Sequence, residues 1–109
     1  MTDLKLPEPI AAYFNADKRD GEAIARCFTT RAIVKDEGQT HCGPAAIKAW
    51  KTETSAKYSY TSEPFAVEHK EGRYVVTSRL TGNFPGSPVD LRFVFRLERG
   101  KIAFLEITP

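Results

Sequence analysis

Residues 89–108, VDLRFVFRLERGKIAFLEIT, form the most regular part of the chain. From position 89 to 97 every odd-numbered side chain is apolar, and the side chains between them are mostly charged. This alternation has the period of two residues that a strand with one buried face requires. Arg99 and Gly100 mark a turn, and residues 101–108 follow with apolar side chains on both faces. The stretch therefore predicts two adjacent antiparallel strands.

Further strands are indicated upstream of this pair. Residues 58–61 and 65–68 are strand-like, and Pro64 between them indicates a bulge or an edge position. Residues 74–80 follow a turn at Glu71 and Gly72, and residues 83–88 form a loop that is rich in proline and glycine. The second half of the chain thus predicts a four-stranded meander.

The first half of the chain predicts helices and two short strands. Pro7 and Pro9 suit the first turn of a helix, because the N–H that proline lacks is not needed there. Apolar residues at helical spacing occur three times: Ile10, Tyr13 and Phe14; then Ile24, Cys27 and Phe28; then Ile47 and Trp50. Residues 32–36 and 39–41 have strand periodicity instead. Helices on one face of a mixed or antiparallel sheet make an α+β fold.

Composition excludes several classes of protein. A chain of 109 residues has the length of one domain, and 16 basic against 14 acidic residues leave no basic stripe for nucleic acid. No apolar run approaches the ~20 residues of a membrane span, and no signal peptide is recognisable, so we expect a cytoplasmic protein. Cys27 and Cys42 are expected to be free thiols there. Without a cluster of metal ligands or a glycine-rich phosphate loop, we expect neither metal nor cofactor.

Three segments carry a family resemblance: IARCFTTRAIVKD at residues 24–36, HCGPAAIKAW at 41–50 and GKIAFLEI at 100–107. In this order and spacing they resemble the nuclear transport factor 2-like superfamily, in its SnoaL-like or ketosteroid-isomerase-like branch. The resemblance covers almost the whole chain and implies one domain at residues 1–109. The implied fold is a cystatin-like α+β roll, a strongly curved sheet wrapped around the helices that encloses a cone-shaped apolar pocket. Homodimers formed through the outer sheet face are implied as well.

Asp36 is the first candidate for chemistry. Its register with Ala32 and Val34 turns the carboxylate inward, and the resemblance places it where isomerases and cyclases of the family hold a general base. Apolar surroundings would raise its pKa, whereas the alternative is an ordinary aspartate of a hairpin turn. His41 either forms an acid–base dyad with Asp36 or is a rim histidine with a structural hydrogen bond. Tyr13 lies near the place of a family tyrosine that donates to an oxyanion, or is a core tyrosine.

Aromatic side chains form a second group of candidates, either as ligand contacts in the pocket or as ordinary core. They are Phe14, Trp50, Tyr58, Tyr60 and Phe84. Arg92, counted back from Gly100, stands where the steroid isomerases of the family hold a protonated acid. Arginine stays cationic, so Arg92 either binds an anionic group of a ligand or faces solvent. This departure argues against steroid isomerase activity.

The sequence leaves three functions open. The first is the binding of a small apolar or weakly polar organic ligand without catalysis. The second is a cofactor-independent isomerase, dehydratase or cyclase, with Asp36 as general base on a hydrophobic polyketide- or steroid-like substrate. The third is a protein-interaction module. Because one fold hosts many activities, the choice depends on the site.

Overall fold

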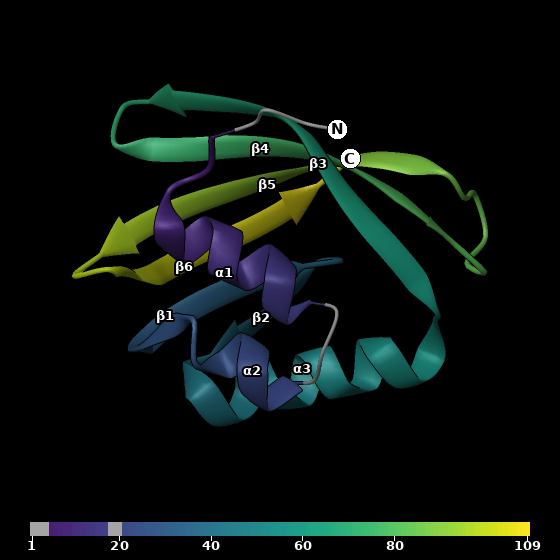
Figure 1. The fold of residues 1–109 in the computed structure, drawn as a ribbon. Helices are drawn as coiled ribbons and strands as arrows, with labels where there is room; N and C mark the ends of the chain where they lie inside the picture. Colours follow the sequence, from purple (N-terminus) through teal and green to yellow (C-terminus); the bar gives the residue numbers. More distant parts are fainter. Residues whose placement is uncertain (1–4, 18–20) are drawn as a thin grey trace.

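Three helices and six strands make up the described part of the chain, residues 5–17 and 21–109 of the computed structural model (Figure 1). The helices are α1 (Glu8–Ala16), α2 (Gly21–Ala25) and α3 (Gly43–Lys57). The strands are β1 (Phe28–Asp36), β2 (Gln39–Cys42), β3 (Tyr60–Lys70), β4 (Arg73–Gly82), β5 (Val89–Glu98) and β6 (Lys101–Thr108).

The strands form one sheet in the order β2-β1-β6-β5-β4-β3. As predicted, β5 and β6 pair antiparallel, with Phe95 opposite Leu105. The sheet is mixed, because β1 runs parallel to β6, and β2, α3 and β3 to β5 connect these two strands. At the edge, β3 shifts its register with β4 between Pro64 and Ala66. The edge position and the bulge indicated by Pro64 are therefore both confirmed.

Helix α1 fills one end of the inner sheet face. Pro9 stands in its first turn, and the buried rings of Tyr13 and Phe14 pack edge-to-face on Phe95 and Phe93 of β5. Such ring pairs stabilise a core beyond the effect of their buried area. This aromatic cluster forms the centre of the hydrophobic core.

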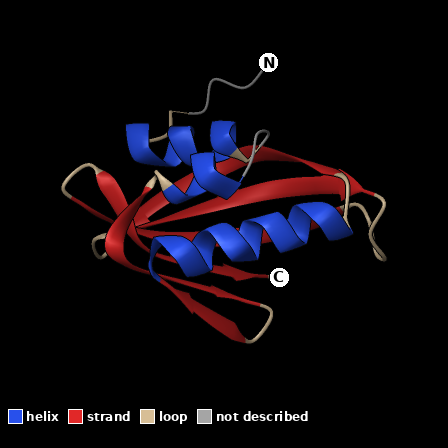
Figure 2. Ribbon diagram, turned by 90° about the horizontal axis from the view of Figure 1, so that it is seen from below, coloured by secondary structure: helices blue, strands red, loops and turns tan. Residues whose placement is uncertain are grey.

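Helix α3 packs against β1, on the same face of the sheet as α1 and α2 (Figures 1 and 2). It begins at Gly43, whose φ of 83° favours glycine, and it buries Ile47, Trp50 and Lys51 at positions i, i+3 and i+4. Figure 1 shows β3 bending down from the sheet to meet the end of α3. The predicted α+β roll is confirmed.

Two element boundaries differ from the prediction. Helix α2 ends at Ala25, and Phe28, expected on its apolar face, instead begins β1 opposite Ile102. Sheet pairing overrides the helical spacing here, because β1 both pairs the backbone of Phe28 and buries its ring. Tyr58 caps the end of α3, and the two segments expected on either side of Pro64 form the single strand β3.

The described residues hold neither a membrane-spanning helix nor a cluster of metal ligands. No helix among them is long and apolar enough to cross a membrane. Within residues 5–17 and 21–109, no three His, Cys, Asp or Glu side chains come together as a metal site would require. Cys27 is half-buried and Cys42 exposed, and both are free thiols.

Candidate functional site

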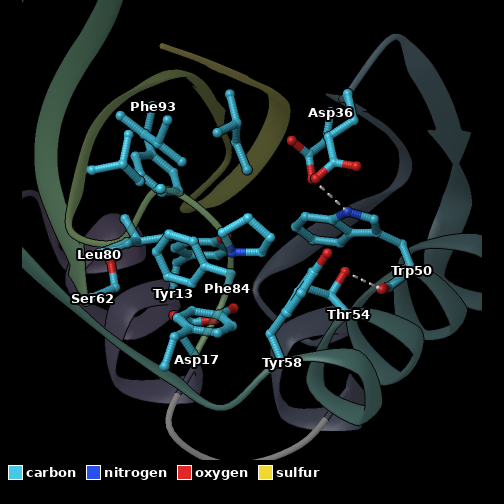
Figure 3. A pocket seen from close by; sticks show the side chains of 17 residues that line it. Tyr13, Asp17, Asp36, Trp50, Thr54, Tyr58, Ser62, Leu80, Phe84 and Phe93 are labelled. Carbon is cyan, nitrogen blue, oxygen red and sulfur yellow. Dashed lines mark hydrogen bonds between the residues drawn. The ribbon is translucent and has the colours of Figure 1, made fainter. Parts of the chain in front are cut away.

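A cavity of about 420 Å³ lies between α1, α3 and the inner sheet face (Figure 3). This volume falls in the range of small-molecule sites, roughly 300–1,000 Å³. Its wall is mainly aromatic and aliphatic: Tyr13, Trp50, Tyr58, Tyr60, Leu80, Phe84, Pro85, Gly86, Val89, Leu91, Phe93 and Ile107. Polar groups are few: Asp17, Asp36, Glu37, Thr54 and Ser62. The cavity therefore suits an apolar molecule with a small number of polar atoms.

Asp36 is the last residue of β1 and lines the cavity. Its neighbours on the same strand face, Ala32 and Val34, are fully buried, as the sequence register predicts. The Nε1–H of Trp50 donates a hydrogen bond to the Asp36 carboxylate over 3.1 Å (Figure 3). Burial raises the pKa of Asp36, an effect that the Trp50 hydrogen bond opposes and the charge of Glu37 reinforces. A half-buried carboxylate in this setting can hold or release a proton nearer neutral pH than an exposed one.

His41 does not form the expected hydrogen bond with Asp36. It lies on β2 opposite Val34, and its ring centre stands 6.0 Å from the ring of Trp50. Among the described side chains, Trp50 rather than His41 donates to the Asp36 carboxylate, so the hydrogen bond of an acid–base dyad is absent here. His41 does not line the main cavity; it lines a smaller hollow of about 160 Å³ that shares Trp50 and Asp36 with the main cavity.

Tyr13 is 3% exposed and lines the cavity from α1. Every fully enclosed polar side-chain atom among the described residues has a hydrogen-bond partner. The hydroxyl of Tyr13 has none in that part of the chain, so it is open to the cavity. Burial raises the pKa of Tyr13, with Asp17 adding to the effect, and the hydroxyl stays a protonated donor.

A buried ion pair lies at another place on the wall, and sequence reasoning missed it. Lys51 Nζ of α3 donates hydrogen bonds to Asp17 Oδ1 and to the Tyr60 hydroxyl. The Tyr60 hydroxyl in turn donates to Asp17 Oδ1 over 3.2 Å. A signal was present in the sequence, because Lys51 occupies the apolar stripe of α3 beside Ile47 and Trp50.

The sequence matches no protein-family model and no curated protein. Among solved structures, a proposed polyketide cyclase from Sinorhizobium meliloti is 38% identical, with 94% of this chain and 95% of that chain covered and a TM-score of 0.90. The chain belongs to the SnoaL-like/nuclear transport factor 2-like superfamily.

More distant structures share the fold of this SnoaL-like chain. A ketosteroid isomerase-like protein from Catenulispora acidiphila, in complex with trimethylamine, is 18% identical, with 96% and 87% of the two chains covered and a TM-score of 0.85. An epoxide hydrolase/cyclase-like enzyme of pyran ring formation in salinomycin is 22% identical, with 93% and 87% covered and a TM-score of 0.77. Structures related to this chain thus bind small organic ligands.

The SnoaL-like cavity includes most of the aromatic residues singled out in the sequence. Trp50, Tyr58, Tyr60 and Phe84 line it, and the rings of Tyr58 and Phe84 meet edge-to-face with centres 6.2 Å apart. Their contact with a ligand stays a prediction.

Two residues singled out as ligand contacts lie elsewhere. Phe14 belongs to the core, because its ring packs on Phe93 and Phe95 rather than facing the cavity. Arg92 is exposed on β5 and does not line the cavity. Its strand neighbours Leu91 and Phe93 do, and alternation along a strand sends Arg92 to the opposite face. No charged side chain therefore reaches the cavity from this position of the SnoaL-like fold.

Proposed function

We propose that this chain, as one SnoaL-like domain of residues 1–109, binds a small apolar or weakly polar organic molecule in its cavity. The observation that carries the proposal is the aromatic wall with Asp36 set into it. Aromatic surface supplies affinity for an apolar body, and few polar groups orient it. The near balance of charge, 16 basic against 14 acidic residues, fits an uncharged ligand.

Fluorescence tests this proposal directly. Trp50 is the only tryptophan of the sequence and lines the cavity, so its emission reports on occupancy. We expect 4-phenylphenol, an uncharged flat probe, to change that emission saturably and to raise the melting temperature. Leu80→Phe fills part of the cavity and should weaken binding, whereas Thr81→Phe, at an exposed neighbouring position, should not. If a panel of neutral aromatic and alicyclic probes leaves both signals unchanged, the proposal is wrong.

A second candidate function is a cofactor-independent isomerase, dehydratase or cyclase with Asp36 as general base. It is favoured by the raised pKa of Asp36 on the cavity wall and by the 38% identical relative, a proposed polyketide cyclase. Polyketide-like compounds that bind are the substrates to assay. Asp36→Asn should lower turnover by orders of magnitude while affinity is retained, because the amide keeps the shape but cannot take a proton. Unchanged turnover would exclude Asp36 as the base.

We also propose that the protein is a cytoplasmic homodimer joined through the outer sheet face. Phe65 on β3 is 46% exposed, with the guanidinium of Arg79 5.6 Å from the centre of its ring, and its exposed apolar surface supports a contact there. Analytical ultracentrifugation at tens of micromolar should show a dimer that Phe65→Lys weakens. A monomer at that concentration would contradict this assembly.

A further inference from the structure

The hydrogen-bonded cluster of Asp17, Lys51 and Tyr60 joins three elements that are distant in the sequence. Asp17 directly follows α1, Lys51 comes from the buried stripe of α3, and Tyr60 is the first residue of β3. Figure 3 shows Asp36 on one side of the cavity beside Trp50 and Asp17 on another. Asp36 and Asp17 thus lie at separate places on the cavity wall.

Burying the charges of Asp17 and Lys51 lowers the stability of the fold through lost solvation. Lys51 is 1% exposed, and the Asp17 side chain is 9% exposed. Removing two such charges from water costs several kcal/mol per ion, which apolar residues of similar size would avoid. Stability alone therefore does not account for the pair. Two of the three cluster members, Asp17 and Tyr60, also line the cavity, which points to a role toward a ligand.

Hydrogen-bonding capacity is left over on Asp17, which lines the cavity. Both Lys51 and Tyr60 donate to Oδ1 of Asp17, while Oδ2 accepts no hydrogen bond from a described side chain. Tyr13 stands four residues before Asp17 at the same end of α1, so the two side chains share a helix face. Its hydroxyl is open to the cavity, as described above. One acceptor and one donor therefore lie side by side.

We propose that Asp17 and Tyr13 form a second polar subsite that binds a hydroxyl group of the ligand, at the end remote from Asp36. Asp17 accepts the hydroxyl hydrogen and Tyr13 donates to the hydroxyl oxygen, while Lys51 and Tyr60 are positioning residues for Asp17. Because Lys51 balances the charge of Asp17, the subsite suits a neutral alcohol or phenol rather than an ammonium or a carboxylate. This inference rests on the proposed ligand cavity and names the chemistry of its ligand.

Two probes that differ only in whether their oxygen carries a hydrogen or a methyl group test Asp17 as the hydrogen-bond acceptor. We would compare 4-phenylphenol with 4-methoxybiphenyl, which keeps the oxygen but cannot donate, by following the emission of Trp50. The wild type should bind the phenol roughly tenfold more tightly, the value of one hydrogen bond to a charged acceptor. In the double variant Asp17→Leu/Lys51→Met, which removes both charges and the acceptor at position 17 together, this ratio should fall toward one. The ratio should persist in Asp36→Asn and in the control Tyr58→Phe.

A second variant tests the donor independently of the ion pair. Tyr13→Phe should weaken phenol and ether by a similar factor and leave their ratio unchanged, because both oxygens accept from Tyr13. The subsite is overturned if the ratio survives the double variant, if it collapses in Asp36→Asn instead, or if Tyr13→Phe changes neither affinity. These outcomes leave the ligand cavity standing. Failure of both probes to bind wild-type protein would overturn the cavity proposal itself.

Discussion

Replacing Asp17 by asparagine leaves the buried ammonium of Lys51 without its counter-charge. The two side chains are 9% and 2% exposed, so water cannot replace the lost carboxylate. Removing one partner of such a pair costs about 3–5 kcal/mol. The introduced amide would keep one oxygen that can still accept from Lys51 and Tyr60, so we expect the lower end, about 3 kcal/mol. For a domain with a total stability of about 5–15 kcal/mol, that is a large fraction.

Urea denaturation followed by Trp50 emission measures the free energy of unfolding. With a denaturant slope of about 1–3 kcal/mol per molar urea, the midpoint should fall by roughly 1–3 M. Adding Lys51→Met to Asp17→Asn removes the stranded charge and should recover most of the loss. Arg79 and Asp90 supply the control, because their side chains are 59% and 43% exposed and hydrogen-bonded to each other. Asp90→Asn should hardly move the midpoint, since water screens that pair. A loss for Asp17→Asn no larger than for Asp90→Asn, or a double variant no more stable than the single, would show that Asp17 and Lys51 do not form a buried charge pair.

Three further predictions concern the cavity. Asp36→Asn should stabilise the protein at neutral pH. Burial raises the pKa of Asp36, so the folded state binds the proton of this carboxyl more tightly than the unfolded state does. The wild-type protein therefore loses stability as the pH rises from the ordinary pKa of 3.8 through the raised one. Urea denaturation of both proteins from pH 3 to pH 8 should show the advantage disappear below about pH 4, and a constant difference would contradict it. Trp50→Phe removes the hydrogen bond that opposes this shift and should raise the pKa of Asp36 further, as a carboxyl NMR titration would record; a lower pKa would show that the bond is unimportant. Phe84→Ala should weaken 4-phenylphenol binding roughly five- to tenfold, measured by calorimetry, while Arg92→Ala on the opposite sheet face leaves it unchanged.

Most of the sheet could be predicted from the sequence because its signals are local. Alternation along β5 and the turn at Arg99 and Gly100 specify a hairpin without reference to the rest of the chain. Pro64 likewise indicates a bulge or an edge because it lacks an N–H. Phe28 was misplaced because its spacing from Ile24 suits a helix, and only pairing with β6 reveals the strand.

The polar geometry of the site could be predicted only in part. The inward direction of the Asp36 side chain follows from strand register. Its hydrogen-bond partner depends on where α3 lies, which the sequence does not show. His41 is nearer to Asp36 in the sequence, but Trp50 of α3 is the residue that donates to it. The Asp17–Lys51 contact spans 34 residues, and no spacing rule connects them. Tyr13 and Phe14 are consecutive core residues on one helix, and helical periodicity does not reveal that Tyr13 also lines the cavity whereas Phe14 does not.

Stability and binding are separated along the single strand β5. Phe95 is 0% exposed and packs among the rings of α1, whereas Leu91, four residues earlier on the same face, is half-buried and lines the cavity. Phe95→Ala should therefore cost about 3–5 kcal/mol in urea denaturation, because it opens a void in a filled core. Leu91→Ala should cost less, since its side chain already borders empty space, but should weaken 4-phenylphenol binding, because it removes wall that the ligand would contact. The opposite order, with Leu91→Ala the more destabilising and binding intact, would mean that the inner face of β5 is core along its whole length and that the ligand lies elsewhere.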